Sequence, residues 1–150
     1  MLVRTLIFLA INFGGLYLGS LFTNTGVSSD WYTNLNKAPW TPPGWVFGFA
    51  WTTIMICFSV FMAKLSLVGT KEIWILFILQ FLLNVLWNPA YFHFQNMDLA
   101  LIIIISLTVI VSILGLCFKD QLGAYALLIM PYFVWLIIAD SLNLYTCLYN

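Results

Sequence analysis

Residues 31–51 read WYTNLNKAPWTPPGWVFGFAW and lead from a long polar interval into a strongly apolar run. Four tryptophans and three prolines fall within this stretch. Proline fixes φ and lacks a backbone N–H, so the connection holds its shape without helix or strand hydrogen bonds. Large rings on a stiff backbone suit two roles, anchoring at a membrane interface and forming a surface for a flat ligand. The stretch alone leaves both roles open.

The remainder of the chain is strongly apolar. Of its 150 residues, 63% are hydrophobic and 7% are charged, whereas roughly a quarter of the residues in soluble domains are charged. Five apolar runs are each long enough to cross about 30 Å of hydrocarbon as a helix. They lie at about 5–22, 43–67, 73–92, 99–118 and 122–146. None alternates strictly between apolar and polar residues, as the strands of a membrane barrel do. We therefore predict an all-α integral membrane protein, a single domain built as a five-transmembrane-helix bundle.

The connections between these runs differ in length. The first, at 23–42, is long, and loops of this length in compact proteins often bind ligands or cover a site. The other three are short and predict that most sequential helices pack as antiparallel neighbours. At the start of the second run, Thr41 offers a capping hydroxyl, and prolines are tolerated in a first turn.

Charge excludes some partners and predicts an orientation. Five Lys and Arg balance five Asp and Glu, so no basic surface is available for nucleic acid. With five alternating spans, one membrane side carries Arg4, Lys64, Lys71 and Lys119, and the other carries only Lys37. Positive residues favour the cytoplasm, so we predict a multi-pass protein with a cytoplasmic N-terminus.

Residues for metal binding or acid–base catalysis are scarce. Cys57, Cys117 and Cys147 lie far apart within apolar runs, and His93 is the only histidine. Neither zinc nor haem ligation is predicted from this set, so we expect no metal and no cofactor. No nucleophile with a partner base can be assembled, which argues against acid–base enzymes.

Two helix faces combine amides with large rings. Helical spacing of three and four places these residues on one face of each helix. The third run contributes Asn84, Trp87, Asn88 and Tyr91, and the fifth contributes Tyr132, Trp135, Ala139 and Asn143. Such residues face the protein interior, either as interhelical hydrogen bonds or as walls of a ligand cavity. Pro89 removes a helix hydrogen bond and predicts a kink that would widen such a cavity.

Asp140 is the one carboxylate inside an apolar run. Counting about 18 residues from the start of that run puts it roughly 27 Å along the helix, close to the far interface. We therefore expect an acid at the interface or the edge of a cavity, rather than a proton relay or a ligand contact.

Three segments together resemble a known family, and the resemblance covers essentially the whole chain. They are WYTNLNKAPWTPPGWVFGFAW at 31–51, LLNVLWNPAYF at 82–92 and PYFVWLIIADSLN at 131–143. These segments are similar to the TspO/MBR family of tryptophan-rich sensory proteins and translocator proteins. The resemblance implies a bacterial cell membrane protein, often a homodimer, with a cavity under the first loop. Porphyrins such as protoporphyrin IX and isoquinoline or benzodiazepine-type compounds are the ligands it implies.

The family's cholesterol-binding pattern is incomplete here, because no Lys or Arg follows Tyr145 and Tyr149. From the resemblance and the two helix faces together we predict a set of ligand-binding residues. The set comprises Trp31, Tyr32, Lys37, Trp51, Asn84, Trp87, Asn88, Tyr132, Trp135, Ala139 and Asn143. Lys37 would meet a ligand carboxylate, while Trp40 and Trp45 would anchor the protein at the interface.

The leading functional hypothesis is a receptor or sensor for a porphyrin or another flat hydrophobic molecule. One alternative is light- or oxidant-dependent porphyrin degradation, in which the resemblance implicates Trp31 and Trp135. Another is passive transport of porphyrin or lipid-like solutes. The partners we expect are the small molecule, membrane lipid and a second copy of the chain.

Overall fold

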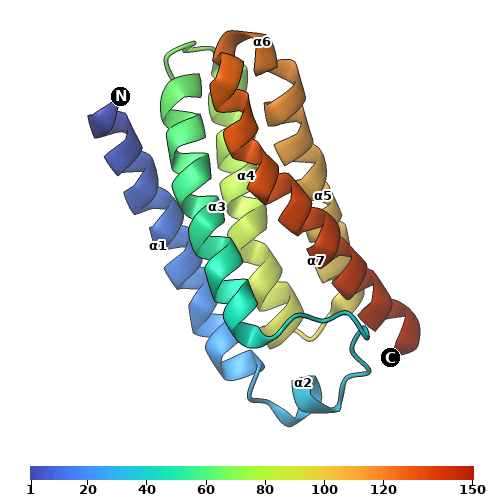
Figure 1. Ribbon diagram of the computed structural model, residues 1–150. Helices are drawn as coiled ribbons and strands as arrows, with labels where there is room; N and C mark the ends of the chain where they lie inside the picture. The colour runs from blue at the N-terminus through green and yellow to red at the C-terminus, as the bar shows by residue number, and fades with distance from the viewer.

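The computed structural model describes residues 1–150 and is all-helical (Figure 1). Five segments are long and apolar enough to cross a membrane, which confirms the predicted fold class. The helices are α1 (Leu2–Gly26), α2 (Asp30–Asn34), α3 (Gly44–Leu65), α4 (Lys71–Asn88), α5 (Met97–Cys117), α6 (Lys119–Leu122) and α7 (Met130–Tyr149). A π-turn, Pro89–His93, follows α4, and a 3-10 segment, Gly123–Ile129, precedes α7.

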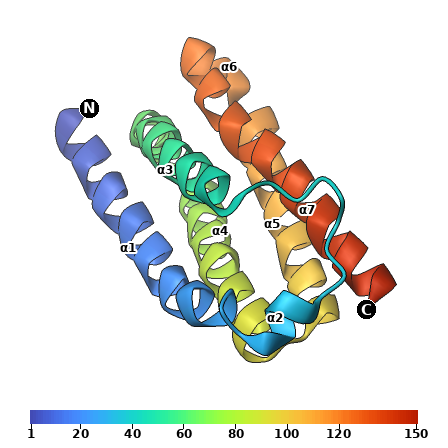
Figure 2. The same cartoon turned by 60° about the horizontal axis from the view of Figure 1, so that its bottom comes forward.

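The five long helices form a ring in the order α1, α3, α7, α5, α4 (Figure 2). Two of the three short connections join neighbouring helices, as predicted, and the long first connection also joins neighbours, α1 and α3. The exception is the pair α3 and α4, which both pack against α1. Large rings separate their backbones, since Phe58 and Phe77 stack between them with centroids 6.4 Å apart. The N-terminus lies at the end of the bundle near α6, whereas α2 and the C-terminus lie at the other end (Figure 1).

The packed core fills the half of the bundle nearer the N-terminus. Phe58, Phe61 and Met62 of α3 and Tyr132 and Leu136 of α7 are fully buried there. A buried hydrogen bond of 2.9 Å from the Asn12 amide to the Ser59 hydroxyl joins α1 to α3 in the same half. The half nearer α2 is less completely filled by buried side chains, and this leaves room for a cavity.

Small residues on α1 serve packing inside the bundle. A Cβ added at Gly15 would lie 2.6 Å from the Phe81 ring, and one at Gly19 would lie 2.5 Å from the Asn88 amide nitrogen. Both neighbours belong to α4, so the two glycines permit close approach of α1 and α4.

Several helix ends differ from those predicted. Helix α3 begins after Pro43, and the Thr41 hydroxyl donates to the Ala38 carbonyl (2.7 Å) instead of capping the helix, so the predicted cap is wrong. The predicted fifth helix is interrupted, because Gly123 adopts a left-handed φ of 55° and a 3-10 segment follows before α7 starts. At Pro89 the predicted kink takes the form of the π-turn, in which the Phe94 N–H donates to the Pro89 carbonyl (2.9 Å).

Candidate functional site

A cavity of about 580 Å³ lies under the first loop, between α1, α3, α4 and α7; we call it the loop-side cavity. Its volume falls in the range of roughly 300–1,000 Å³ that is usual for small-molecule sites. Most of the predicted ligand-binding residues line it. They are Tyr32, Lys37, Trp51, Trp87, Asn88, Ala139 and Asn143.

Two further predicted residues lie behind the cavity wall and hold helices together. The Tyr132 side chain is fully buried, and its hydroxyl accepts hydrogen bonds from the Gln80 amide (2.8 Å) and the Asn84 amide (2.9 Å). These bonds link α4 to α7 across the bundle. Interhelical hydrogen bonding was one of the two interpretations of the polar faces of α4 and α7. It accounts for Asn84 and Tyr132.

Trp31 and Trp135 also lie behind the wall, each in contact with a ring that lines the cavity. Trp31 meets Tyr91 edge to face with centroids 5.5 Å apart, and Trp135 meets Phe47 in the same way at 5.2 Å. A ligand in the cavity would therefore meet Tyr91 and Phe47 first. Direct ligand contact by the two tryptophans stays a prediction.

The side-chain amides of the cavity wall have hydrogen-bond partners on neighbouring elements. The Trp87 indole N–H donates to Asn143 (3.0 Å), and the Asn143 amide donates to the Met97 carbonyl (3.1 Å). The Thr23 hydroxyl donates to Asn88 at 2.7 Å. Residues of α4 that join helices thus also form the wall of the cavity, and ligand binding by them stays a prediction.

Lys37 is the only charged side chain in the lining. Its ammonium nitrogen lies 4.2 Å from the centroid of the Tyr32 ring, an arrangement that stabilises a cation over an aromatic face. Burial raises the pKa of the Tyr32 hydroxyl, so the phenol is neutral near pH 7. The cavity therefore presents a positive group and no negative one.

The first loop is fastened across the end of the bundle by the C-terminal helix. The Asn36 N–H donates to the side chain of Asn150 (2.7 Å), and the Asn150 amide donates back to the Asn36 carbonyl (3.2 Å). The Trp40 indole donates to the Ser141 hydroxyl (3.1 Å), and its ring meets Tyr145 edge to face. Trp40, expected as a membrane anchor, therefore also docks the loop onto α7.

Sequence reasoning missed the contribution of α1 to this site. Residues from its last three turns line the cavity, namely Leu16, Ser20, Thr23 and Asn24, with Val27 just beyond. Across from them, Gly44 and Gly48 of α3 line the cavity, and a Cβ at either position would meet no other atom within 4 Å. The polar residues from Thr23 onward predict a loop, whereas α1 continues to Gly26 and brings Thr23 and Asn24 to the cavity.

Asp140 lies far from the predicted position near the interface. The Thr108 hydroxyl, at the middle of α5, donates to its Oδ2 at 2.8 Å. Thr108 lies near the midpoint of α5, so this contact places Asp140 at mid-depth of the bundle. The interfacial position is therefore wrong. Asp140 is also absent from the lining of the loop-side cavity and faces α5 instead.

Potential metal ligands are dispersed in this chain. No three His, Cys, Asp or Glu side chains come close enough to hold a metal ion, and all three cysteines are unpaired. What the loop-side cavity offers is shape, aromatic surface and one cation.

Comparison with known proteins is consistent with this arrangement. The model of the TspO/MBR family matches residues 7–148. The chain belongs to the TspO/MBR family. It is 34% identical to the tryptophan-rich sensory protein of Cereibacter sphaeroides over 116 residues, which cover 76% of this chain and 73% of that protein. It is 31% identical to the tryptophan-rich protein TspO of Archaeoglobus fulgidus over 137 residues, covering 89% of this chain and 88% of that protein.

An animal relative is similar over nearly the same length. The chain is 30% identical to the translocator protein of Bos taurus over 135 residues, which cover 86% of this chain and 79% of that protein. The match to the TspO/MBR family model includes the first loop and all five long helices, and thus every element that lines the loop-side cavity.

Proposed function

We propose that this membrane protein is a receptor that holds a flat, mainly apolar molecule with an acidic group, of the porphyrin class, in the loop-side cavity. The observation that carries the proposal is the composition of the lining. A cavity of about 580 Å³ combines several aromatic rings with a single cationic side chain.

Aromatic surface supplies the affinity for a flat ligand. Trp51 lines the cavity from α3, Trp87 from the end of α4, Tyr91 from the π-turn that follows, and Tyr32 from the first loop. A flat ring system placed among them leaves water and meets π faces, and each Å² of apolar surface buried contributes about 25 cal/mol. Trp87 and Tyr91 are already stacked, with centroids 5.1 Å apart, and so offer a preformed flat wall.

Charge supplies the preference for an acidic ligand. Lys37 is the only charged group in the lining, and a ligand carboxylate beside it would form a charge-assisted hydrogen bond. Cationic ligands of the same shape would find no counter-charge. The receptor is therefore expected to favour anionic over cationic tetrapyrroles.

Quenching of tryptophan fluorescence by protoporphyrin IX tests this proposal. Ala139→Leu fills the cavity from α7 and is expected to weaken binding about tenfold or more, and Lys37→Met is expected to weaken it severalfold for the acid but not for its dimethyl ester. Trp45→Phe is the matched control, because Trp45 lies outside the lining and is highly exposed. Wild-type affinity in both Ala139→Leu and Lys37→Met would refute the site.

Porphyrin breakdown is the second candidate. The observation in its favour is that Trp31 and Trp135 each touch a ring of the cavity wall, which gives an excited ligand two aromatic neighbours one ring away. A homodimer is also expected from the family. Gly15 and Gly19 are used within the bundle, so such a dimer would form through another surface.

A further inference from the structure

The Asp140 carboxyl lacks a hydrogen-bond partner that its surroundings require. Its Oδ2 lies 2.8 Å from the Thr108 hydroxyl, while its Oδ1 is buried and has no partner. The Thr108 hydroxyl is also 3.0 Å from the Ile104 carbonyl. It can therefore donate to an ionised Asp140 carboxylate, or accept from a protonated carboxyl while it donates to the Ile104 carbonyl. In both states Oδ1 remains an acceptor without a donor, which is costly away from water.

No cation of the chain can neutralise this carboxyl. Arg4 lies in the first turn of α1, Lys64 in the last turn of α3, and Lys71 and Lys119 begin α4 and α6. Lys37 lies in the first loop. All five are therefore near the ends of the bundle, whereas Asp140 pairs with the middle of α5. An ionised carboxylate at this level has no counter-charge from the protein.

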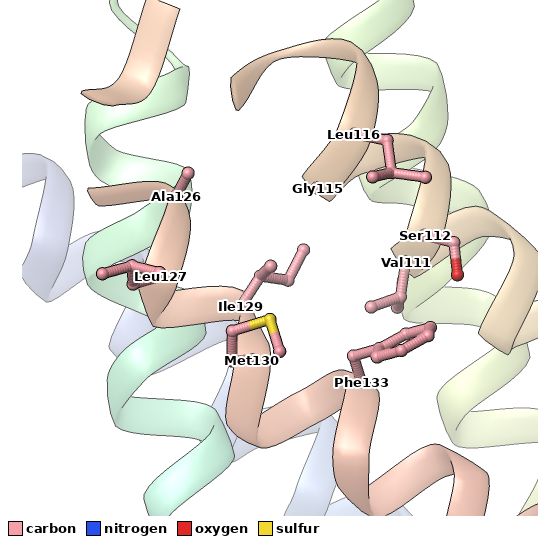
Figure 3. A pocket seen from close by; sticks show the side chains of 9 residues that line it. All are labelled: Val111, Ser112, Gly115, Leu116, Ala126, Leu127, Ile129, Met130 and Phe133. Atoms are coloured by element: carbon pink, nitrogen blue, oxygen red, sulfur yellow. The ribbon is translucent and has the colours of Figure 1, made fainter. Parts of the chain in front are cut away.

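An apolar cavity of about 280 Å³ lies in a groove between α5 on one side and the 3-10 segment with the start of α7 on the other (Figure 3). We call it the α5–α7 groove. Ile129, Met130 and Phe133 border it on one side, and Val111, Ser112 and Leu116 on the other. Its volume is just below the usual range for drug-sized ligands and suits a single alkyl chain better than a tetrapyrrole. Leu116 and Leu127 at its margin are about 70% exposed, so the cavity opens on the outer surface of the bundle.

Helix geometry connects this cavity to Asp140. The Ser112 hydroxyl, on the cavity wall, donates to the Thr108 carbonyl (2.7 Å), so the wall ends one turn, about 6 Å, from the residue that holds Asp140. On α7, Phe133 and Asp140 are seven residues apart and share a face. Neither Thr108 nor Asp140 lines the cavity, so the unpartnered carboxyl oxygen lies beyond its end, about 6 Å along α5 from Ser112 and about 10 Å along α7 from Phe133.

We propose that the α5–α7 groove is a second binding site, for an amphiphile with an ammonium head at Asp140 and an apolar chain in the cavity beside Phe133. An ammonium group supplies both the missing donor and the missing positive charge, and hydrogen bonds between charged groups are roughly twice as strong as neutral ones. An alcohol would supply only the donor, and a carboxylic acid would add a like charge. The groove shares no lining residue with the loop-side cavity, so its ligand is distinct from the one proposed there.

Photolabelling of the full-length protein tests the second site. The protein is placed in nanodiscs of neutral phosphatidylcholine and exposed to an alkylamine that carries a diazirine on its chain. Saturable labelling of residues 111–116 and 126–133, located by mass spectrometry, is the expected result. Asp140→Asn keeps the shape and the Thr108 contact but removes the charge, and is expected to lower apparent affinity about tenfold.

Two controls make the outcome decisive. Asp98→Asn removes the same charge from an exposed position at the start of α5 and is expected to leave labelling unchanged. The alcohol of equal chain length is expected to label the groove about tenfold more weakly than the amine. Equal labelling of wild type and Asp140→Asn, equal labelling by alcohol and amine, or absence of saturable labelling in the groove would each overturn the proposal. Retention of protoporphyrin quenching in Asp140→Asn shows that the variant is folded.

Discussion

Tyr132→Phe removes one oxygen atom from the centre of the bundle and is expected to destabilise it by about 2 kcal/mol. The hydroxyl accepts hydrogen bonds from Gln80 and Asn84, and leaving a buried donor unpaired costs about 1–3 kcal/mol. Gln80 is 2% exposed, and its amide N–H donates to no other acceptor. The unpaired Gln80 amide therefore accounts for most of the lost stability. Asn84 is partly exposed and can turn toward another partner, so it contributes about the 0.6 kcal/mol that is average for hydrogen bonds between membrane helices.

Reversible unfolding in mixed micelles, followed by circular dichroism, measures this loss. A change of about 2 kcal/mol alters the ratio of folded to unfolded protein about 30-fold. The companion variant is Gln80→Leu in the Tyr132→Phe background. Because this double variant removes donor and acceptor together, it is expected to be more stable than Tyr132→Phe alone. If Tyr132→Phe matches the wild type, or if the two substitutions are simply additive, the reasoning about this hydrogen-bond pair is refuted.

Three other outcomes can be measured. Asn150→Ala removes both hydrogen bonds to Asn36, so amide exchange across residues 30–37 should become severalfold faster by mass spectrometry while exchange within α5 stays unchanged. Trp135→Phe should slow light-driven bleaching of bound protoporphyrin if the protein degrades it, and bleaching at the same rate without protein would exclude that activity. Burial raises the pKa of Tyr32, so the folded phenol keeps its proton where the unfolded one ionises; stability should fall as pH rises above about 10, and Tyr32→Phe should reduce this fall in thermal unfolding.

The five spans were predictable because each depends on a local property. A run of about 20 apolar residues must form a helix in hydrocarbon whatever its neighbours do. The common face of Asn84, Trp87 and Asn88 was predictable for a similar reason, since the spacings of three and four from Asn84 fix it. The order of the helices around the bundle was harder to predict, because it depends on which aromatic side chains fill the centre. Phe58 and Phe77 keep α3 and α4 apart despite their short loop.

The depth of Asp140 shows where counting along the sequence fails. Residues 122–129 are as apolar as a membrane helix, so hydropathy extends the fifth span back to about 122. A single left-handed glycine, Gly123, starts a turn and a 3-10 segment there, and α7 begins only at Met130. The contact with Thr108, at the middle of α5, places Asp140 in the middle of the bundle rather than at the expected interface. Hydropathy locates a span but not the level at which its residues meet a neighbouring helix.

The two cavities differ in how their polar groups are satisfied, and this difference suits different kinds of ligand. In the loop-side cavity, the Trp87 indole and the amides of Asn88 and Asn143 have partners within the chain, so the empty cavity leaves few polar groups unpaired. A ligand there gains mainly from burial of flat surface, which tolerates variation in its polar substituents. Beyond the end of the α5–α7 groove, Asp140 Oδ1 is left without a donor. A buried polar group without a hydrogen-bond partner favours ligands that supply the partner over ligands that do not. The α5–α7 groove is therefore expected to be the more selective of the two cavities.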